Sequence, residues 1–226
     1  EAVENQPLMI RKAVEWIDQR KGGGPFFLYF PMCPPHTPIA PAPEFVGKSG
    51  AKDLVKRDPN YGDWLHQGDA MLGQILDALE RNQLAENTLV IAASDNGAEG
   101  RAYAPWRAAK RSIYEGGHRV PFVARWPGKV KAGSTSGQTL CLDDLMATAA
   151  EILGAKLPAN AGEDSVSFLP ALLGRAQGPL REATVHQSST GDLAIRQGPW
   201  KLIFLKSGRR ELYHLGNARG ETTDVL

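Results

Sequence analysis

The stretch that decides the fold is TLVIAASDNG, residues 88–97, where an apolar run ends abruptly in polar and turn-forming residues. A continuous apolar run of this length, closed by such residues, predicts a strand buried in a sheet. Similar runs predict two further strands, at residues 26–30 and 120–126. Apolar residues at helical spacing predict helices in three places, around residues 10–17, 62–82 and 143–153.

Strands therefore alternate with helices along most of the chain, which predicts the α/β class, with part of a mostly parallel sheet flanked by helices. The pattern changes after about residue 180. Short apolar segments joined by Gly-Pro and Ser-Gly turns predict a small antiparallel sheet, with strands at residues 193–196, 200–205 and 211–215. We accordingly predict two parts, an α/β portion over residues 1–180 and an incomplete antiparallel subdomain over residues 181–226.

Composition excludes several classes of partner. The chain has 226 residues and a net charge of +1, so we expect neither nucleic acid nor an acidic membrane surface as a partner. No apolar run approaches membrane-spanning length, and the segment that follows Glu1 lacks the features of a signal peptide. The two cysteines, Cys33 and Cys141, fit neither a zinc site nor a disulfide framework. Composition gives no indication of the oligomeric state.

Asp95 and Asn96 directly follow the predicted strand at residues 88–93. Ligands of open α/β sheets bind beyond the carboxyl ends of the strands. A carboxylate and an amide oxygen are hard ligands suited to Ca²⁺ or Mg²⁺. Taken alone, however, the tripeptide Asp95-Asn96-Gly97 favours an ordinary Asn-Gly turn.

Two more segments carry residues capable of chemistry. The segment KRSIYEGGHRVP, residues 110–121, places Lys110 and a glycine pair before a strand, which fits an anion site and a solvated basic loop equally well. His36 lies in PPHTP, residues 34–38, where prolines restrict the backbone. A histidine there could donate a proton or bind an anion, although a solvent-facing loop histidine is more common.

The order of these segments resembles the type I sulfatases, the formylglycine-dependent, arylsulfatase-like enzymes of the alkaline phosphatase-like superfamily. The resemblance rests on a strand followed by His-Thr-Pro, then Ser-Asp-Asn-Gly, then Lys-x4-Glu-Gly-Gly-x-Arg-Val-Pro and Trp-Pro-Gly. It continues through GEDSVSFLP at residues 162–170, AIRQGPWKL at residues 194–202, and ELY at residues 211–213 with RGET at residues 219–222. Essentially all 226 residues are covered, and the ordered set is far more specific than any one piece.

The resemblance implies a sulfuric ester hydrolase that uses a divalent metal. It implies that Asp95 and Asn96 are metal ligands, usually for Ca²⁺, with Mg²⁺ as an alternative. It assigns Lys110 and His36 to sulfate binding and catalysis, with His36 as the general acid for the leaving alcohol. By the same resemblance, the neighbours of Lys110 support its loop without being catalytic; these are Glu115, Gly116, Gly117 and Arg119.

Several parts of the family pattern are absent from these residues. They are the nucleophile motif, the paired aspartate metal ligands near the family's N-terminus, and the Arg, Lys and His around the nucleophile. The family modifies a cysteine in Cys-x-Pro-Ser/Ala-Arg to formylglycine, and neither Cys33 nor Cys141 lies in that motif. We therefore expect formylglycine in an N-terminal half that precedes this chain, and we expect the chain to be a fragment that is inactive by itself. The implied substrate is a small-molecule or carbohydrate sulfate ester of undetermined identity. The implied location is periplasmic, secreted or lysosomal.

Two other interpretations stay open at this point. One is a phosphodiesterase or phosphonate hydrolase of the same superfamily, although Asn96 and the Glu-Gly-Gly-x-Arg-Val-Pro loop favour a sulfatase. The other is a truncated remnant without catalytic activity, which an upstream nucleophile motif in the reading frame would exclude.

Overall fold

The computed structural model describes residues 2–51, 60–99, 104–217 and 219–226, and the chain forms two compact units. The first unit comprises Glu1–Thr88 and the second Leu89–Leu226. The predicted boundary near residue 180 marks the start of a separate sheet inside the second unit. As a domain boundary of the whole protein it stays a prediction.

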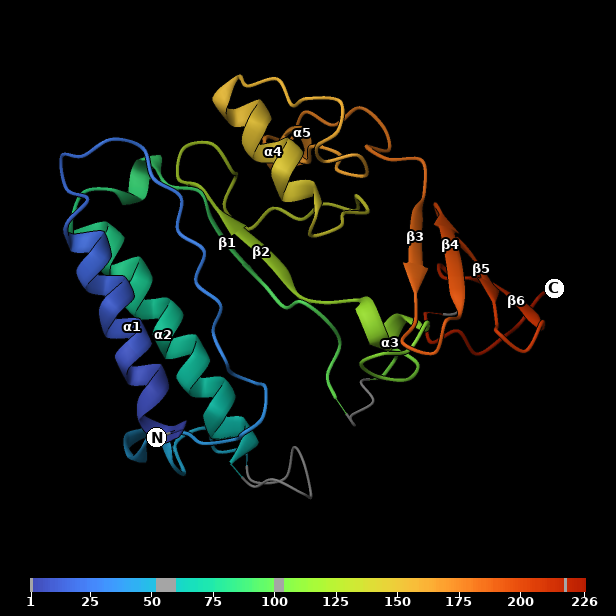
Figure 1. Ribbon diagram of the computed structural model, residues 1–226, viewed down its shortest axis with the longest axis horizontal. Coiled ribbons are helices and arrows are strands. Elements are labelled where there is room, and N and C mark those ends of the chain that lie inside the picture. Colours follow the sequence, from blue (N-terminus) through green and yellow to red (C-terminus); the bar gives the residue numbers. More distant parts are fainter. Residues whose placement is uncertain (1, 52–59, 100–103, 218) are drawn as a thin grey trace. The chain divides into compact units, whose positions relative to one another are not determined.

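The first unit is built on two helices, α1 (Ala2–Asp18) and α2 (Tyr61–Arg81), which lie side by side (Figure 1). Their apolar faces are buried and include Ile10 and Ile17 of α1 and Met71 of α2. The single turns η1 (Pro43–Phe45) and η2 (Ala85–Asn87) complete the unit. Both long helices lie where the periodicity predicts them. None of the described helices is long and apolar enough to cross a membrane.

The apolar run at residues 26–30 does not form a strand, so this prediction was wrong. Its side chains alternate between partly buried and exposed, with Phe27 72% and Tyr29 75% exposed. A strand requires a neighbour for its backbone N–H and C=O groups. The described residues supply no such neighbour here, so the segment stays extended and unpaired.

The second unit begins with a two-stranded ribbon of β1 (Val90–Ala93) and β2 (Phe122–Arg125). The strands are antiparallel, with Ile91 opposite Ala124, whereas the alternation of elements predicted parallel pairing. Parallel neighbours need a long crossover, usually a helix. Among the described residues of this connection, the only helical element is the single turn α3 (Glu115–His118), and the chain returns antiparallel. Two helices follow, α4 (Asp144–Leu153) and α5 (Leu169–Leu172).

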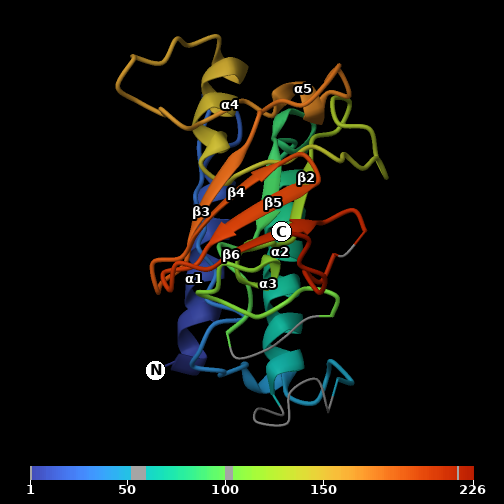
Figure 2. The ribbon, with the colours of Figure 1, turned by 90° about the vertical axis from the view of Figure 1, so that its right-hand side faces the viewer.

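The second unit ends in a four-stranded sheet in which the strands lie in sequence order and every pair is antiparallel (Figure 2). This confirms the predicted C-terminal sheet and adds one strand, β3, that the sequence did not reveal. Its inward face packs Ala194, Ile203 and Tyr213 against Ile113 of the preceding loop. Helices and strands both occur along the chain, which confirms the α/β class. The strands are β3 (Thr184–Gln187), β4 (Leu193–Gln197), β5 (Trp200–Phe204) and β6 (Arg210–His214).

Candidate functional site

Asp95 and Asn96 lie just beyond the end of β1, as the sequence predicts. The Asn96 side-chain amide donates a hydrogen bond of 2.5 Å to the Asp95 carboxylate. The Ser94 hydroxyl donates to the Asn96 carbonyl at 3.0 Å and fixes the turn. Because the amide nitrogen faces Asp95, the amide oxygen of Asn96 and the second carboxylate oxygen remain as acceptors for a cation.

These two side chains carry the oxygen atoms that a hard cation prefers, but they provide fewer ligands than such a cation needs. Calcium takes roughly six to eight oxygen ligands. Within residues 2–51, 60–99, 104–217 and 219–226, no group of three or more His, Cys, Asp or Glu side chains could hold a metal ion. Any cation bound by Asp95 and Asn96 therefore needs further ligands other than His, Cys, Asp and Glu side chains of these described residues.

Three glycines bring the loop after β1 against the loop before β2. The Gly97 N–H donates to the Gly117 carbonyl at 2.9 Å, and the Gly116 N–H donates to the Arg107 carbonyl at 2.8 Å. A Cβ on Gly97 would lie 1.8 Å from the Gly116 carbonyl oxygen, and one on Gly117 would lie 2.1 Å from the Ser112 oxygen. No side chain fits at either position, so close backbone contact explains the glycine-rich motif better than flexibility does.

Lys110 lies in the second of these loops. Its backbone N–H donates to the Ala98 carbonyl at 3.0 Å, three residues after Asp95. The two loops are thus joined at both ends, by this bond and by the bond from Gly97. Among the described residues, the Lys110 ammonium has no carboxylate within ion-pairing distance, so its charge is available to an anion.

His36 belongs to the first unit, in a tight loop next to α2. Its carbonyl accepts the Trp64 indole N–H at 2.9 Å, and its backbone N–H donates to the Cys33 carbonyl at 2.7 Å. The ring Nδ1 lies 2.6 Å from the Thr37 carbonyl. A carbonyl accepts only, so Nδ1 donates to Thr37, and Nε2 is the nitrogen of this exposed ring that faces no described partner. The structure brings Asp95, Asn96 and Lys110 together in one unit and places His36 in the other.

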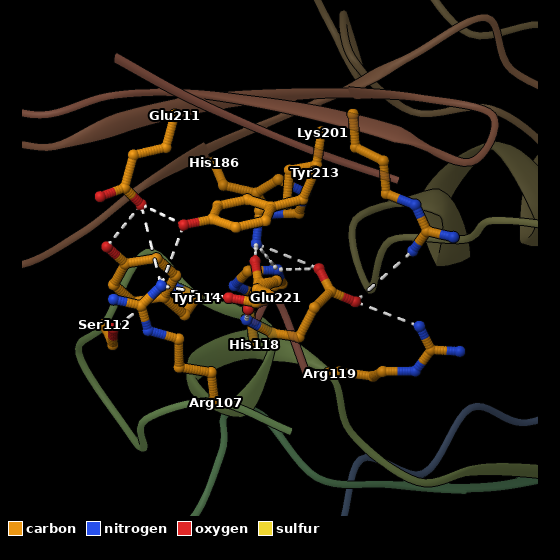
Figure 3. Close-up of polar contacts among 12 residues, drawn as sticks. Arg107, Ser112, Tyr114, His118, Arg119, His186, Lys201, Glu211, Tyr213 and Glu221 are labelled. Atoms are coloured by element: carbon orange, nitrogen blue, oxygen red, sulfur yellow. Dashed lines mark hydrogen bonds and ion pairs between the residues drawn. The ribbon is translucent and has the colours of Figure 1, made fainter. Parts of the chain in front are cut away.

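A buried ionic cluster lies where α3 meets the C-terminal sheet, and Figure 3 shows its polar contacts. The side chains of Glu115, Lys201 and Glu221 are all 0–1% exposed. Lys201 donates to Glu115 at 3.1 Å and to Glu221 at 2.7 Å, which joins α3 to β5 and to the C-terminal segment. His118 and Arg119 also contact the Glu115 carboxylate, each at 3.1 Å.

The electrostatics of this cluster keep its carboxylate charged. Burial alone would raise the pKa of Glu115, but the hydrogen bond from His118 and the charge of Lys201 outweigh it and hold the pKa well below its ordinary value. Beside it, the His118 and His186 rings stack with centroids 4.1 Å apart. Burial, followed by the nearby charges of His118 and Lys201, lowers the pKa of His186 to about 3. His186 is therefore neutral at physiological pH.

A second buried carboxylate, Glu211 of β6, holds the same loop through the Tyr114 phenol and also binds Tyr213 of its own strand. It accepts the Tyr114 and Tyr213 hydroxyls at 2.8 and 2.7 Å. Burial and the bond to Glu211 raise the pKa of Tyr114 to about 12, so its hydroxyl stays a donor. Arg107 lies over the Tyr114 ring at 3.7 Å and donates to the Tyr213 hydroxyl at 3.0 Å.

A family model for sulfatases matches residues 6–155, two thirds of the chain and both loops of the candidate site. The chain belongs to the sulfatase family.

Curated relatives carry sulfatase names and are much longer than this chain. An N-acetylgalactosamine-6-O-sulfatase of Bacteroides thetaiotaomicron is 37% identical over 211 residues, which cover 87% of this chain and 39% of that protein. The human N-acetylgalactosamine-6-sulfatase is 32% identical over 173 residues, 74% of this chain and 32% of its own length. The chain thus spans about a third of the length of these relatives.

Solved structures agree with this assignment. A structure described under the metabolism of multiple glycosaminoglycans by Bacteroides thetaiotaomicron matches the whole chain with a TM-score of 0.84 and 31% identity, over 51% of its own length. Ps i-CgsB, solved in complex with k-i-k-neocarrahexaose, matches 97% of this chain and 50% of its own, with a TM-score of 0.86 and 29% identity.

Within this sulfatase chain, the sequence motifs located both loops but not the cluster that supports them. The sequence did not predict that Lys201 and Glu221 contact Glu115, because both residues lie far along the chain from it. One signal was available. Lys201 shares a face of β5 with Ile203, both at 0% exposure, and a lysine on the apolar face of an alternating strand requires a buried acidic partner.

Proposed function

We propose that the protein to which this chain belongs hydrolyses sulfate esters of carbohydrates, with 6-sulfated N-acetylgalactosamine as the first substrate to test. The family match over residues 6–155 carries the proposal, because it contains every candidate site residue of this chain. The names of the bacterial and human relatives support the choice of sugar. The periplasmic, secreted or lysosomal location stays a prediction.

In this proposal Asp95 and Asn96 supply part of a site for Ca²⁺, with Mg²⁺ as the alternative. Their oxygen donors and their place beyond the end of β1 support the role. A formylglycine hydrate would supply the nucleophile that attacks sulfur. We place it outside these 226 residues because Cys33 and Cys141, both free thiols, lie in no modification motif.

Lys110 would bind the sulfate oxygens and offset the negative charge that develops on them. The absence of an ion-pair partner among the described residues supports this role. His36 would protonate the leaving oxygen of the sugar. The contact between Nδ1 and the Thr37 carbonyl supports that role, because it fixes the ring and leaves Nε2 to deliver the proton.

Assays of the full-length protein test this proposal. Sulfate release from 6-sulfated N-acetylgalactosamine should be measured with and without a chelator, and then after Ca²⁺ or Mg²⁺ is restored. We expect release by the full-length protein, loss with the chelator and recovery with Ca²⁺. The 226-residue polypeptide alone should release none. A full-length protein that hydrolyses the corresponding phosphate ester but not the sulfate ester would contradict the proposal.

A further inference from the structure

Lys201 is the most deeply buried cation of the described residues that contact the site loops, and its charge is unusually well compensated. Its side chain is 0% exposed, and its ammonium donates to the carboxylates of both Glu115 and Glu221. Further cations surround Glu115: Arg119 at 3.1 Å, Arg196 at 3.8 Å and, when protonated, His118 at 3.1 Å. The cluster therefore joins α3 to both β4 and β5.

Stability alone does not explain such a cluster. Removing charges from water costs several kcal/mol per ion, and a buried ion pair is often no more stabilising than apolar residues of similar volume. What an ionic cluster does provide is a defined position, because hydrogen-bond geometry fixes each partner more narrowly than apolar packing does. The relevant question is which part of the chain is fixed.

The fixed part is the backbone of α3, where the Lys110 loop ends. Besides accepting from Lys201, Glu221 accepts the backbone N–H of Glu115 at 2.7 Å through its other oxygen. The next two residues, Gly116 and Gly117, are those against which Gly97 rests. These two glycines are packed too closely to accept a side chain, since a Cβ on Gly116 would lie 2.4 Å from the Ala108 carbonyl oxygen.

A continuous set of short contacts thus connects the C-terminal sheet to the candidate site. It leads from Lys201 to Glu115, through the glycine pair to Gly97, and so to Asp95 and Asn96, the two residues before Gly97. The bond from the Lys110 N–H to the Ala98 carbonyl joins the second loop to the same frame. A shift of Glu115 would displace both loops.

We propose that Lys201 and Glu221 are positioning residues of the sulfate-ester site: from the C-terminal sheet and segment they fix Glu115, and through it the loops that carry Asp95, Asn96 and Lys110. The assignment rests on the proposed function. Neither residue contacts substrate in this scheme, and their effect is exerted through the backbone of α3.

Two variants of the full-length protein test the assignment. Lys201→Met removes the charge and keeps much of the volume, whereas Glu221→Gln is milder because it retains a hydrogen-bonding side chain. Arg181→Met is the matched control, since Arg181 forms a buried ion pair with Asp144 in the same unit, between other segments. All three should lower the melting temperature.

The kinetic readout separates positioning from stability. For Lys201→Met and Glu221→Gln we expect a loss of about 10- to 100-fold in kcat/KM or in the apparent affinity for Ca²⁺, the usual effect of removing a group that orients metal ligands. For Arg181→Met we expect both quantities to match wild type. If Lys201→Met yields no folded protein, Glu221→Gln decides the question.

Amide hydrogen exchange gives a second readout that does not depend on catalysis. The amides of Gly97 and Lys110, which bond across the two loops, and of Gly116, which bonds within the second loop, should exchange faster in Lys201→Met and Glu221→Gln but not in Arg181→Met. A wild-type protein without sulfatase activity would sink the proposed function, while hydrogen exchange would still test the link. The positioning role is overturned if both variants keep wild-type kinetics, Ca²⁺ dependence and loop exchange.

Discussion

At the scale of single residues, Gly97 decides how closely the two site loops approach each other. Its N–H bonds to Gly117, and the space where its side chain would lie is filled by the Gly116 carbonyl oxygen. Gly97 does not have a positive φ angle, so glycine is required here for lack of space and not for its backbone conformation. The Asn-Gly pair is therefore more than a turn: it allows one backbone to rest on another.

Replacing Gly97 with alanine should separate the loops. A Cβ at 1.8 Å from an oxygen cannot be accommodated without movement of the backbone. We expect Gly97→Ala to cost several kcal/mol of unfolding free energy, in the range of severe overpacking, and to weaken the dependence of activity on Ca²⁺. Urea unfolding and a Ca²⁺ titration of activity measure the two effects.

Gly73 provides the control for this substitution. It lies inside α2, where nothing lies within 4 Å of the position of a Cβ. Alanine is favoured over glycine inside helices, so Gly73→Ala should stabilise the protein by about 0.5–1 kcal/mol. Equal effects of the two substitutions would show that the contact between Gly97 and Gly116 is not tight.

At the scale of elements, the contact between α3 and the four-stranded sheet determines how the second unit responds to acid. The stacked rings of His118 and His186 lie next to Glu115 and Lys201. The Nε2 atom of His186 is 2.9 Å from the Thr184 hydroxyl. An extra proton on His186 would add a positive charge beside existing ones, which agrees with its lowered pKa of about 3.

The sign of the pH effect follows from these directions. His186 has a pKa of about 3 in the folded protein and an ordinary value of 6.5, so in that interval the unfolded chain binds a proton that the folded protein does not. The stability that the lowered pKa of His186 contributes is therefore fully present above about pH 6.5, and it is lost as the pH falls toward 3. The lowered pKa of Glu115 adds a loss of the same sign below about pH 4.5.

We therefore expect the unfolding free energy to fall between pH 6.5 and 4.5 by up to about 1.4 kcal/mol per pH unit from His186. The His186→Gln variant, which keeps a partner for Thr184, should show a shallower dependence of unfolding free energy on pH than wild type. The control is His66→Gln, at an exposed position of α2, and it should show the wild-type dependence. Urea unfolding across this pH range measures the slopes. Identical slopes for all three proteins would contradict the role given to His186.

The elements also show how far the sequence alone predicts the structure. Local patterns were sufficient for α1, α2, α4 and the last three C-terminal strands, β4, β5 and β6, because helical spacing and turn residues act over short distances. The run at residues 26–30 failed because its apolar residues do not reveal whether a partner strand is present. The pairing of Glu115 with Lys201 was not predicted, because the alternation of β5 marks Lys201 as a buried lysine but does not show which distant carboxylate it meets.

At the scale of the whole molecule, the chain contributes one side of a proposed sulfate-ester site. Its sequence order identified Asp95, Asn96 and Lys110, and the structure brings these three onto two joined loops of one unit. His36 lies in the other unit. This chain covers about half of each of the two solved structures described above, so the proposed site is to be tested on the full-length protein.

The most direct test of this account is sulfate release by the full-length protein carrying Lys110→Ala. Lys131→Ala, at an exposed position beyond β2, is the control. Loss of a group that stabilises developing charge costs about 10²–10³ in kcat. With 6-sulfated N-acetylgalactosamine we predict a loss of that size for Lys110→Ala and wild-type rates for Lys131→Ala. A Lys110→Ala protein that releases sulfate as fast as the Lys131→Ala control would contradict the assignment of the site.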